Sequence, residues 1–139
     1  MNFEDMVKDA LYTLTNDGTF HIDLISYDEK HFGNVLIVLS SNNRVDIRFI
    51  NDRGIFSCDV GQAGEWFFIE DLFAVIGVTF AVNSDDLIDF IARMAYFIKS
   101  IIPQIFQAFN TENYNDTLIK IKAIENKRVM DMFGLNLTD

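Results

Sequence analysis

The first part of the chain changes from a helical pattern of apolar residues to the alternating pattern of a strand. Between Phe3 and Leu14, apolar residues recur at spacings of three and four, which predicts a short amphipathic helix. An Asn-Asp-Gly sequence at residues 16–18 follows, and such residues end a helix because they tolerate the backbone of a turn. From Phe20 to Ser26, apolar and polar residues alternate, so we expect a half-buried strand.

Three more strands are predicted before residue 61. Residues 35–39 are apolar without interruption, which is typical of a central strand covered on both faces. Residues 45–49 alternate between apolar and polar side chains, which predicts a strand with one wet face. A tight turn at residues 51–54 leads to a returning strand at residues 55–60. Because these links are short, an antiparallel meander is the simplest topology.

The remainder of the chain predicts helices. A short apolar helix is expected from Trp66 to Gly77. A long helix capped by Ser84 should carry a buried stripe as far as Phe109, with a kink at Pro103. A last helix covers residues 111–133, and the residues expected on its inner side are Tyr114, Leu118, Ile121, Val129 and Met132.

These elements predict the α+β class for a single domain over residues 1–139. An antiparallel sheet of about four strands follows an N-terminal helix, and two or three C-terminal helices pack on one face of that sheet. The sequence has no internal repeat or linker, and its length suits one hydrophobic core.

Composition favours a protein of a reducing compartment. Cys58 is the only cysteine, so the chain can form no internal disulfide and no thiolate cluster for a metal. The first residues are acidic where a secretory signal needs a basic start, so we expect a cytoplasmic location. The most apolar stretch, Phe90 to Phe109, is interrupted by charges and by proline and predicts a core helix and no membrane span.

The chain carries a formal charge of −10, and the acid is unevenly placed. Residues 1–89 hold 16 acidic and 5 basic residues, whereas residues 90–139 hold 5 acidic and 6 basic residues. An acidic surface repels phosphate backbones and anionic membranes and attracts basic proteins. We therefore expect a protein partner and no nucleic acid.

Catalytic motifs are absent from the sequence. His21 and His31 stand at no metal-ligand spacing, and each is expected to be an ordinary solvated or strand residue. The alternation of its strand places Cys58 on the apolar face, where a thiol behaves as a small hydrophobe. Neither a nucleophile elbow nor a phosphate-binding glycine loop is present. The sequence therefore predicts no catalytic residue, no metal, no cofactor and no enzyme activity.

One group of polar and aromatic residues surrounds the hairpin centred on residue 53. One interpretation is a partner-binding surface, because arginine and tryptophan dominate many interfaces. Its members are Asp46, Arg48, Asp52, Arg53, Asp59 and Trp66. We favour a structural interpretation, in which Arg48 and Asp59 form an ordinary cross-strand charge pair and Trp66 anchors a helix to the sheet.

Short motifs in the middle and at the end of the chain carry a resemblance. They are His31-Phe32-Gly33-Asn34, the segment Arg48 to Gly54, Trp66-Phe67-Phe68 and Met132-Phe133-Gly134. In these the chain resembles a group of small bacterial proteins, some of which look like immunity proteins of polymorphic toxin systems. The resemblance implies a protein that neutralises a toxin by binding it, and it supplies no catalytic residue.

Three hypotheses follow. The first is an immunity-type protein that binds a basic toxin domain through its acidic surface. The second is a non-catalytic assembly protein, such as a homodimer, that buries surplus apolar residues such as Phe67, Phe68, Phe73 and Phe80. The third is a small-ligand binder in which Arg48 and Arg53 capture a carboxylate or phosphate.

Overall fold

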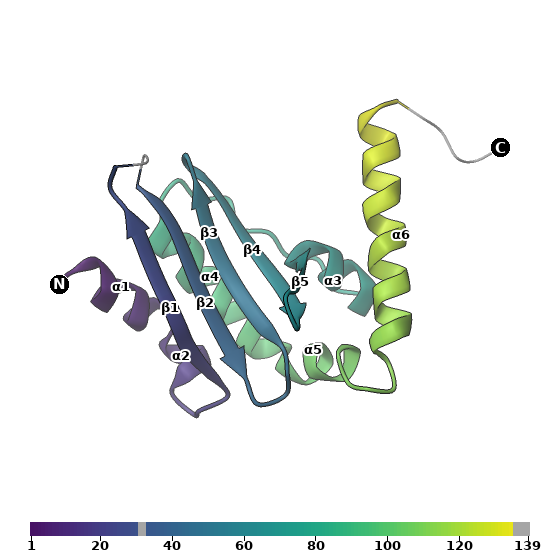
Figure 1. Cartoon of the computed structure of the whole chain (residues 1–139), viewed down its shortest axis with the longest axis horizontal. Coiled ribbons are helices and arrows are strands. Elements are labelled where there is room, and N and C mark those ends of the chain that lie inside the picture. The colour runs from purple at the N-terminus through teal and green to yellow at the C-terminus, as the bar shows by residue number, and fades with distance from the viewer. Residues whose placement is uncertain (31–32, 135–139) are drawn as a thin grey trace.

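A computed structural model describes residues 1–30 and 33–134 (Figure 1). His31, expected in a solvated loop, lies outside the described residues, as does Phe32. The centre of the molecule is one antiparallel sheet whose five strands follow one another in chain order. The strands are β1 (Phe20–Asp28), β2 (Asn34–Ser41), β3 (Asp46–Asp52), β4 (Ile55–Gln62) and β5 (Glu65–Phe68).

Helices precede and follow the sheet in the chain. They are α1 (Phe3–Ala10), α2 (Tyr12–Thr15), α3 (Ile69–Ile76), α4 (Leu87–Ser100), α5 (Ile102–Ala108) and α6 (Tyr114–Met132). The α+β class and the meander are thus confirmed. The expected single N-terminal helix is divided in two at Leu11, and the side chain of Asn2 caps the first of these by accepting a hydrogen bond from the backbone N–H of Asp5.

The helices leave one face of the sheet uncovered. In Figure 1 the sheet lies in front of α4, while α1 and α2 lie at the β1 edge, α5 lies below β5, and α3 and α6 lie beside the short strand β5. The core fills the space between sheet and helices, where Phe49 and Phe90 meet edge to face. On β2 the side chains of Val35, Ile37 and Leu39 are buried in this core.

The expectation that β2 is covered on both faces is wrong. Leu36 and Val38 point away from the core and are only half-buried, because they are shielded by neighbouring strands and not by a helix. An unbroken apolar run predicts a doubly covered strand, but here one of its two faces is open.

The prediction of a helix that starts at Trp66 is also wrong for residues 66–68. Residues 65–68 form the fifth strand, and helix α3 begins only at Ile69. Ala63 and Gly64 both have positive φ, at 55° and 83°, which is the backbone of the tight hairpin turn that suits twisted strands. This turn returns the chain along β4, where aromatic side chains favour a strand.

Pro103 separates two helices. Helix α4 ends at Ser100, and the proline occupies the first turn of α5, where its missing N–H costs nothing. On α6, Ile121 is buried and Tyr114 and Leu118 are half-buried as expected, but Val129 and Met132 are exposed. Their inward placement is wrong, since the side chains of Val129 and Met132 are 45% and 72% exposed. Among the described residues, no helix combines the length and the apolar character needed to cross a membrane.

Candidate functional site

The uncovered side of the sheet forms a continuous surface that we call the open face. Strand pairing arranges its side chains in rows that run across the sheet. One row contains Leu24, Val38, Arg48, Asp59 and Phe68, a second contains His21, Ser40, Asp46, Gly61 and Trp66, and a third contains Ser26, Leu36, Ile50 and Ser57. The open face thus mixes apolar side chains with a few charged ones.

An ion pair lies at the centre of the open face, and an aromatic ring stacks on its arginine. Arg48 donates through Nε to Oδ2 of Asp59 at 2.7 Å, across the β3–β4 pairing. The guanidinium carbon also lies 4.4 Å from the centre of the Trp66 ring. The cross-strand pair expected from the sequence is therefore present, and Trp66 stacks on it instead of anchoring a helix.

The ion pair is largely withdrawn from water. The Asp59 side chain is 7% exposed and that of Arg48 is 29% exposed. The second carboxylate oxygen of Asp59, Oδ1, is buried and has no hydrogen-bond partner among the residues that the structure describes. A buried carboxylate with one free oxygen depends strongly on its single counter-ion.

A second arginine borders the open face at the β5 edge. Arg128 on α6 donates both terminal nitrogens to the Asp71 carboxylate on α3, at 2.6 and 2.8 Å. Its guanidinium carbon lies 5.1 Å from the centre of the Phe68 ring. Sequence reasoning missed this arrangement, because 57 residues separate the two partners and no local pattern joins them.

Two acidic residues, Asp23 on β1 and Asp46 on β3, have no ion-pair partner in the part of the chain that the structure describes. The pKa of Asp46 is raised, first by partial burial and second by the charge of Asp23. No ion pair or hydrogen bond to the Asp46 carboxylate occurs among residues 1–30 and 33–134. The two carboxylates thus repel each other, and a cation supplied from outside would relieve that repulsion.

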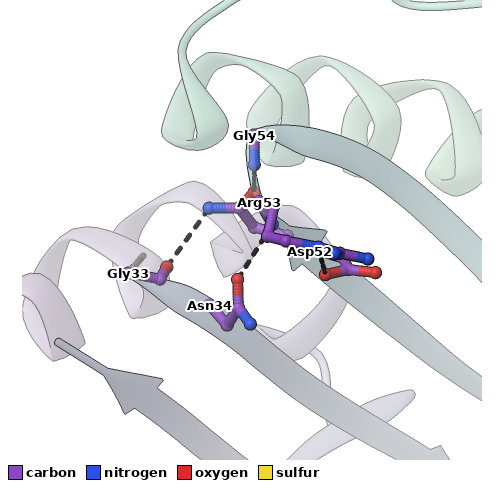
Figure 2. Close-up of polar contacts among 6 residues, drawn as sticks. Gly33, Asn34, Asp52, Arg53 and Gly54 are labelled. Carbon is purple, nitrogen blue, oxygen red and sulfur yellow. Dashed lines mark hydrogen bonds and ion pairs between the residues drawn. The ribbon is translucent and has the colours of Figure 1, made fainter. Parts of the chain in front are cut away.

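Asp52 and Arg53 lie apart from the other four predicted residues, at the tip of the β3–β4 hairpin. Figure 2 shows Arg53 in contact with Asp52, with Nε and Oδ1 separated by 3.1 Å. The backbone N–H of Arg53 donates to the side chain of Asn34 at 2.8 Å, and the N–H of Gly54 donates to Oδ1 of Asn51. Both charged side chains are exposed, so the sequence correctly placed them near the hairpin but not with the central pair.

Among the described residues, the thiol of Cys58 is buried and side chains that could ligate a metal do not cluster. Cys58 lies in the core, and burial raises the pKa of its thiol well above its usual range, with the charges of Glu70 and Asp59 adding to this. A thiol in such surroundings is a poor nucleophile. Within the described ranges no three His, Cys, Asp or Glu side chains gather closely enough to hold a metal ion.

The surplus apolar residues expected at a subunit interface are mostly used inside the molecule. Phe67 and Phe73 are buried in the core, and Phe80 is half-buried and stacks on Phe97 with ring centres 4.0 Å apart. Only Phe68 of the four is exposed, and it belongs to the open face.

Comparisons with protein-family models, with curated proteins and with solved structures found no match to this chain.

Proposed function

We propose that the protein is a non-catalytic binding domain whose open face docks a protein with a cationic surface. The observation that supports this most is a five-stranded sheet with one face free of helices among the described residues, on which apolar rows lie beside Asp46, whose carboxylate is close enough to that of Asp23 to be repelled by it. A sheet face with partly exposed apolar side chains gains free energy when a partner removes it from water.

The apolar part of the open face supplies affinity. Leu24 is 43% exposed and Phe68 is 48% exposed, and both belong to the row that contains the Arg48–Asp59 pair. Arginine and aromatic side chains in a fixed geometry are common among the residues that dominate binding energy. Because Arg48 is already held by Asp59 and Trp66, it loses little side-chain entropy on binding.

Electrostatic interactions determine which kind of partner the open face binds. The chain carries −10 overall, and Asp46 and Asp23 have an unfavourable mutual interaction that a lysine or arginine from a partner would relieve. Electrostatic attraction of this kind raises the association rate and weakens with salt.

The resemblance to immunity proteins suggests a narrower form of this proposal, in which the partner is a basic toxin domain encoded next to this gene. Coexpression tests it: the protein should restore growth to cells that express the neighbouring gene product and should form a complex with it. Growth that stays arrested, with no complex, would refute the immunity role.

The docking surface is tested by replacing Leu24. Leu24→Ser removes an exposed apolar side chain from the open face without disturbing the core, and we expect at least about tenfold weaker binding of the partner. Ile119→Ser is the matched control, since Ile119 is 68% exposed on α6 and lies away from the sheet. Equal affinities for both variants, measured by calorimetry, would place the docking surface elsewhere.

A further inference from the structure

A hollow of about 430 Å³ lies at the end of the sheet away from the β3–β4 hairpin tip. One wall is the turn between β2 and β3, and the other is the connection between α5 and α6, which are neighbours at the lower end of Figure 1. The aromatic rings of Phe106 and Phe109 contribute its apolar part. Neither Arg48 nor Arg53 lines this hollow.

The charge of the hollow is opposite to that of the molecule. Arg44 is the one ionised side chain in its lining, whose other polar side chains are amides and hydroxyls. The chain has 21 acidic and 11 basic residues, whereas the lining holds one arginine and no carboxylate. Within the described ranges Arg44 pairs with no acid, so its five N–H donors remain available.

The polar groups of the lining divide into two sets. One set holds the walls in place: Gln62 donates to the carbonyl of Phe109, Asn110 accepts from the N–H of Asn113, and the Tyr114 hydroxyl donates to Glu65 at 3.0 Å. The other set is Asn42, Asn43, Arg44, Thr111 and Asn115, whose side chains make no hydrogen bond inside the described part of the chain. These side chains are exposed, so their donors can reach a ligand that enters the hollow between walls held by hydrogen bonds.

We propose that this hollow binds a small organic molecule through a carboxylate or phosphate group. Arg44 and the neighbouring asparagine amides donate hydrogen bonds to the oxyanion, and the rings of Phe106 and Phe109 contact the carbon part of the ligand. Arginine suits both oxyanions because its planar donors match two oxygen atoms at once. The site lies on a different part of the molecule from the open face and does not depend on the proposed protein partner.

Nuclear magnetic resonance titration tests the site with two probes, citrate for carboxylate and glycerol phosphate for phosphate, against sodium chloride at equal ionic strength. We expect saturable shifts of the amide signals of residues 42–44 and 110–115 with at least one probe and none with chloride. A response to one probe alone identifies the oxyanion that the site prefers. Shifts that never saturate, or that occur equally with chloride, would overturn the proposal.

Arg44→Asn is the decisive variant. Arg44 has a left-handed backbone with φ at 64°, which asparagine tolerates well, so this change removes the charge and preserves the turn. We expect it to weaken probe binding at least about tenfold. Arg53→Asn is the matched control, because Arg53 also has positive φ, at 52°, but lies at the opposite end of β3. Thermal melting checks that both variants fold, and unchanged binding in Arg44→Asn refutes the site.

Discussion

Asp59 depends on a single arginine, and this dependence can be measured. Its carboxylate is buried, one of its oxygens has no hydrogen-bond partner within residues 1–30 and 33–134, and the other accepts from Arg48. Arg48→Ala leaves that carboxylate buried and unpaired, so we expect the free energy of unfolding to fall by about 2 to 3 kcal/mol in urea denaturation.

Arg53→Ala serves as the control for this measurement. Arg53 pairs with Asp52, but the two side chains are 71% and 57% exposed, so the loss should stay below about 1 kcal/mol. An equal decrease in the free energy of unfolding for Arg48→Ala and Arg53→Ala would mean that burial of the Asp59 carboxylate adds nothing to the effect of removing Arg48.

Tyr114 provides a test in alkaline solution. Burial first, and then the hydrogen bond to Glu65, raise the pKa of Tyr114 from 10.0 to about 12. Because the folded protein holds this proton more tightly than the unfolded chain, the resulting stability is complete below pH 10 and is lost as the pH rises toward 12. Absorbance at 295 nm should show a late tyrosine step that disappears in Tyr114→Phe and persists in Tyr96→Phe.

Single residues were predictable from the sequence only where strand alternation governs them. The alternation of β3 and β4 placed Arg48 opposite Asp59, and the register confirms this. The ring contact of Arg48 with Trp66 was missed because Trp66 was assigned to a helix. The pairing of Arg128 with Asp71 joins distant helices, and no sequence period encodes such a contact.

The β4–β5 hairpin closes so tightly that it excludes a side chain at Gly61. A Cβ atom there would clash with the carbonyl oxygen of Glu65, which is backbone and cannot turn aside. We expect Gly61→Ala to lower the free energy of unfolding by about 3 kcal/mol or more. Gly77→Ala is the comparison, since it meets no nearby atom and only strains a left-handed backbone, at about 1 kcal/mol. Similar losses would contradict this packing.

Helix α6 is held to the body at a few points along its length. Thr117 donates to the carbonyl of Ala108, Ile121 is buried, and Arg128 forms an ion pair with Asp71. We expect Arg128→Ala to accelerate amide hydrogen exchange of residues 122–132 at least about tenfold, because the second half of the helix loses its ion pair. In Lys120→Ala, which removes only an exposed pair with Asp116, exchange should stay unchanged. Unaltered exchange in Arg128→Ala would show that other contacts hold the helix.

At the level of elements, periodic pattern was enough for β1 to β4 and for α6, but the single long helix expected as far as Phe109 is two helices, α4 and α5. It failed at β5, since three aromatic residues before an apolar helix resemble the start of that helix. The deciding feature is the turn at Ala63 and Gly64, whose positive φ values return the chain to the sheet. It also failed for the end of α6, whose apolar residues have the spacing of a buried stripe but no surface to cover.

The molecule carries two different kinds of surface at separate places. Its sheet presents the open face with apolar rows and unpaired acids, and one end presents an acid-free hollow with Arg44. The formal charge of −10 predicts that association with a cationic partner weakens as salt rises. Association rates measured between about 50 and 500 mM salt should fall steadily, and rates independent of salt would contradict electrostatic attraction.

Reversing the charge of one residue on the open face shows whether this face binds a cationic protein. Asp46→Lys and Asp85→Lys change the net charge equally, but Asp46 lies on the open face and Asp85 precedes α4. The measurement is the dissociation constant of the partner isolated from native cells with the unaltered protein. The account predicts at least about tenfold weaker binding for Asp46→Lys and less than about twofold change for Asp85→Lys. Equal affinities for the two variants, or no partner retained by the unaltered protein, would contradict it.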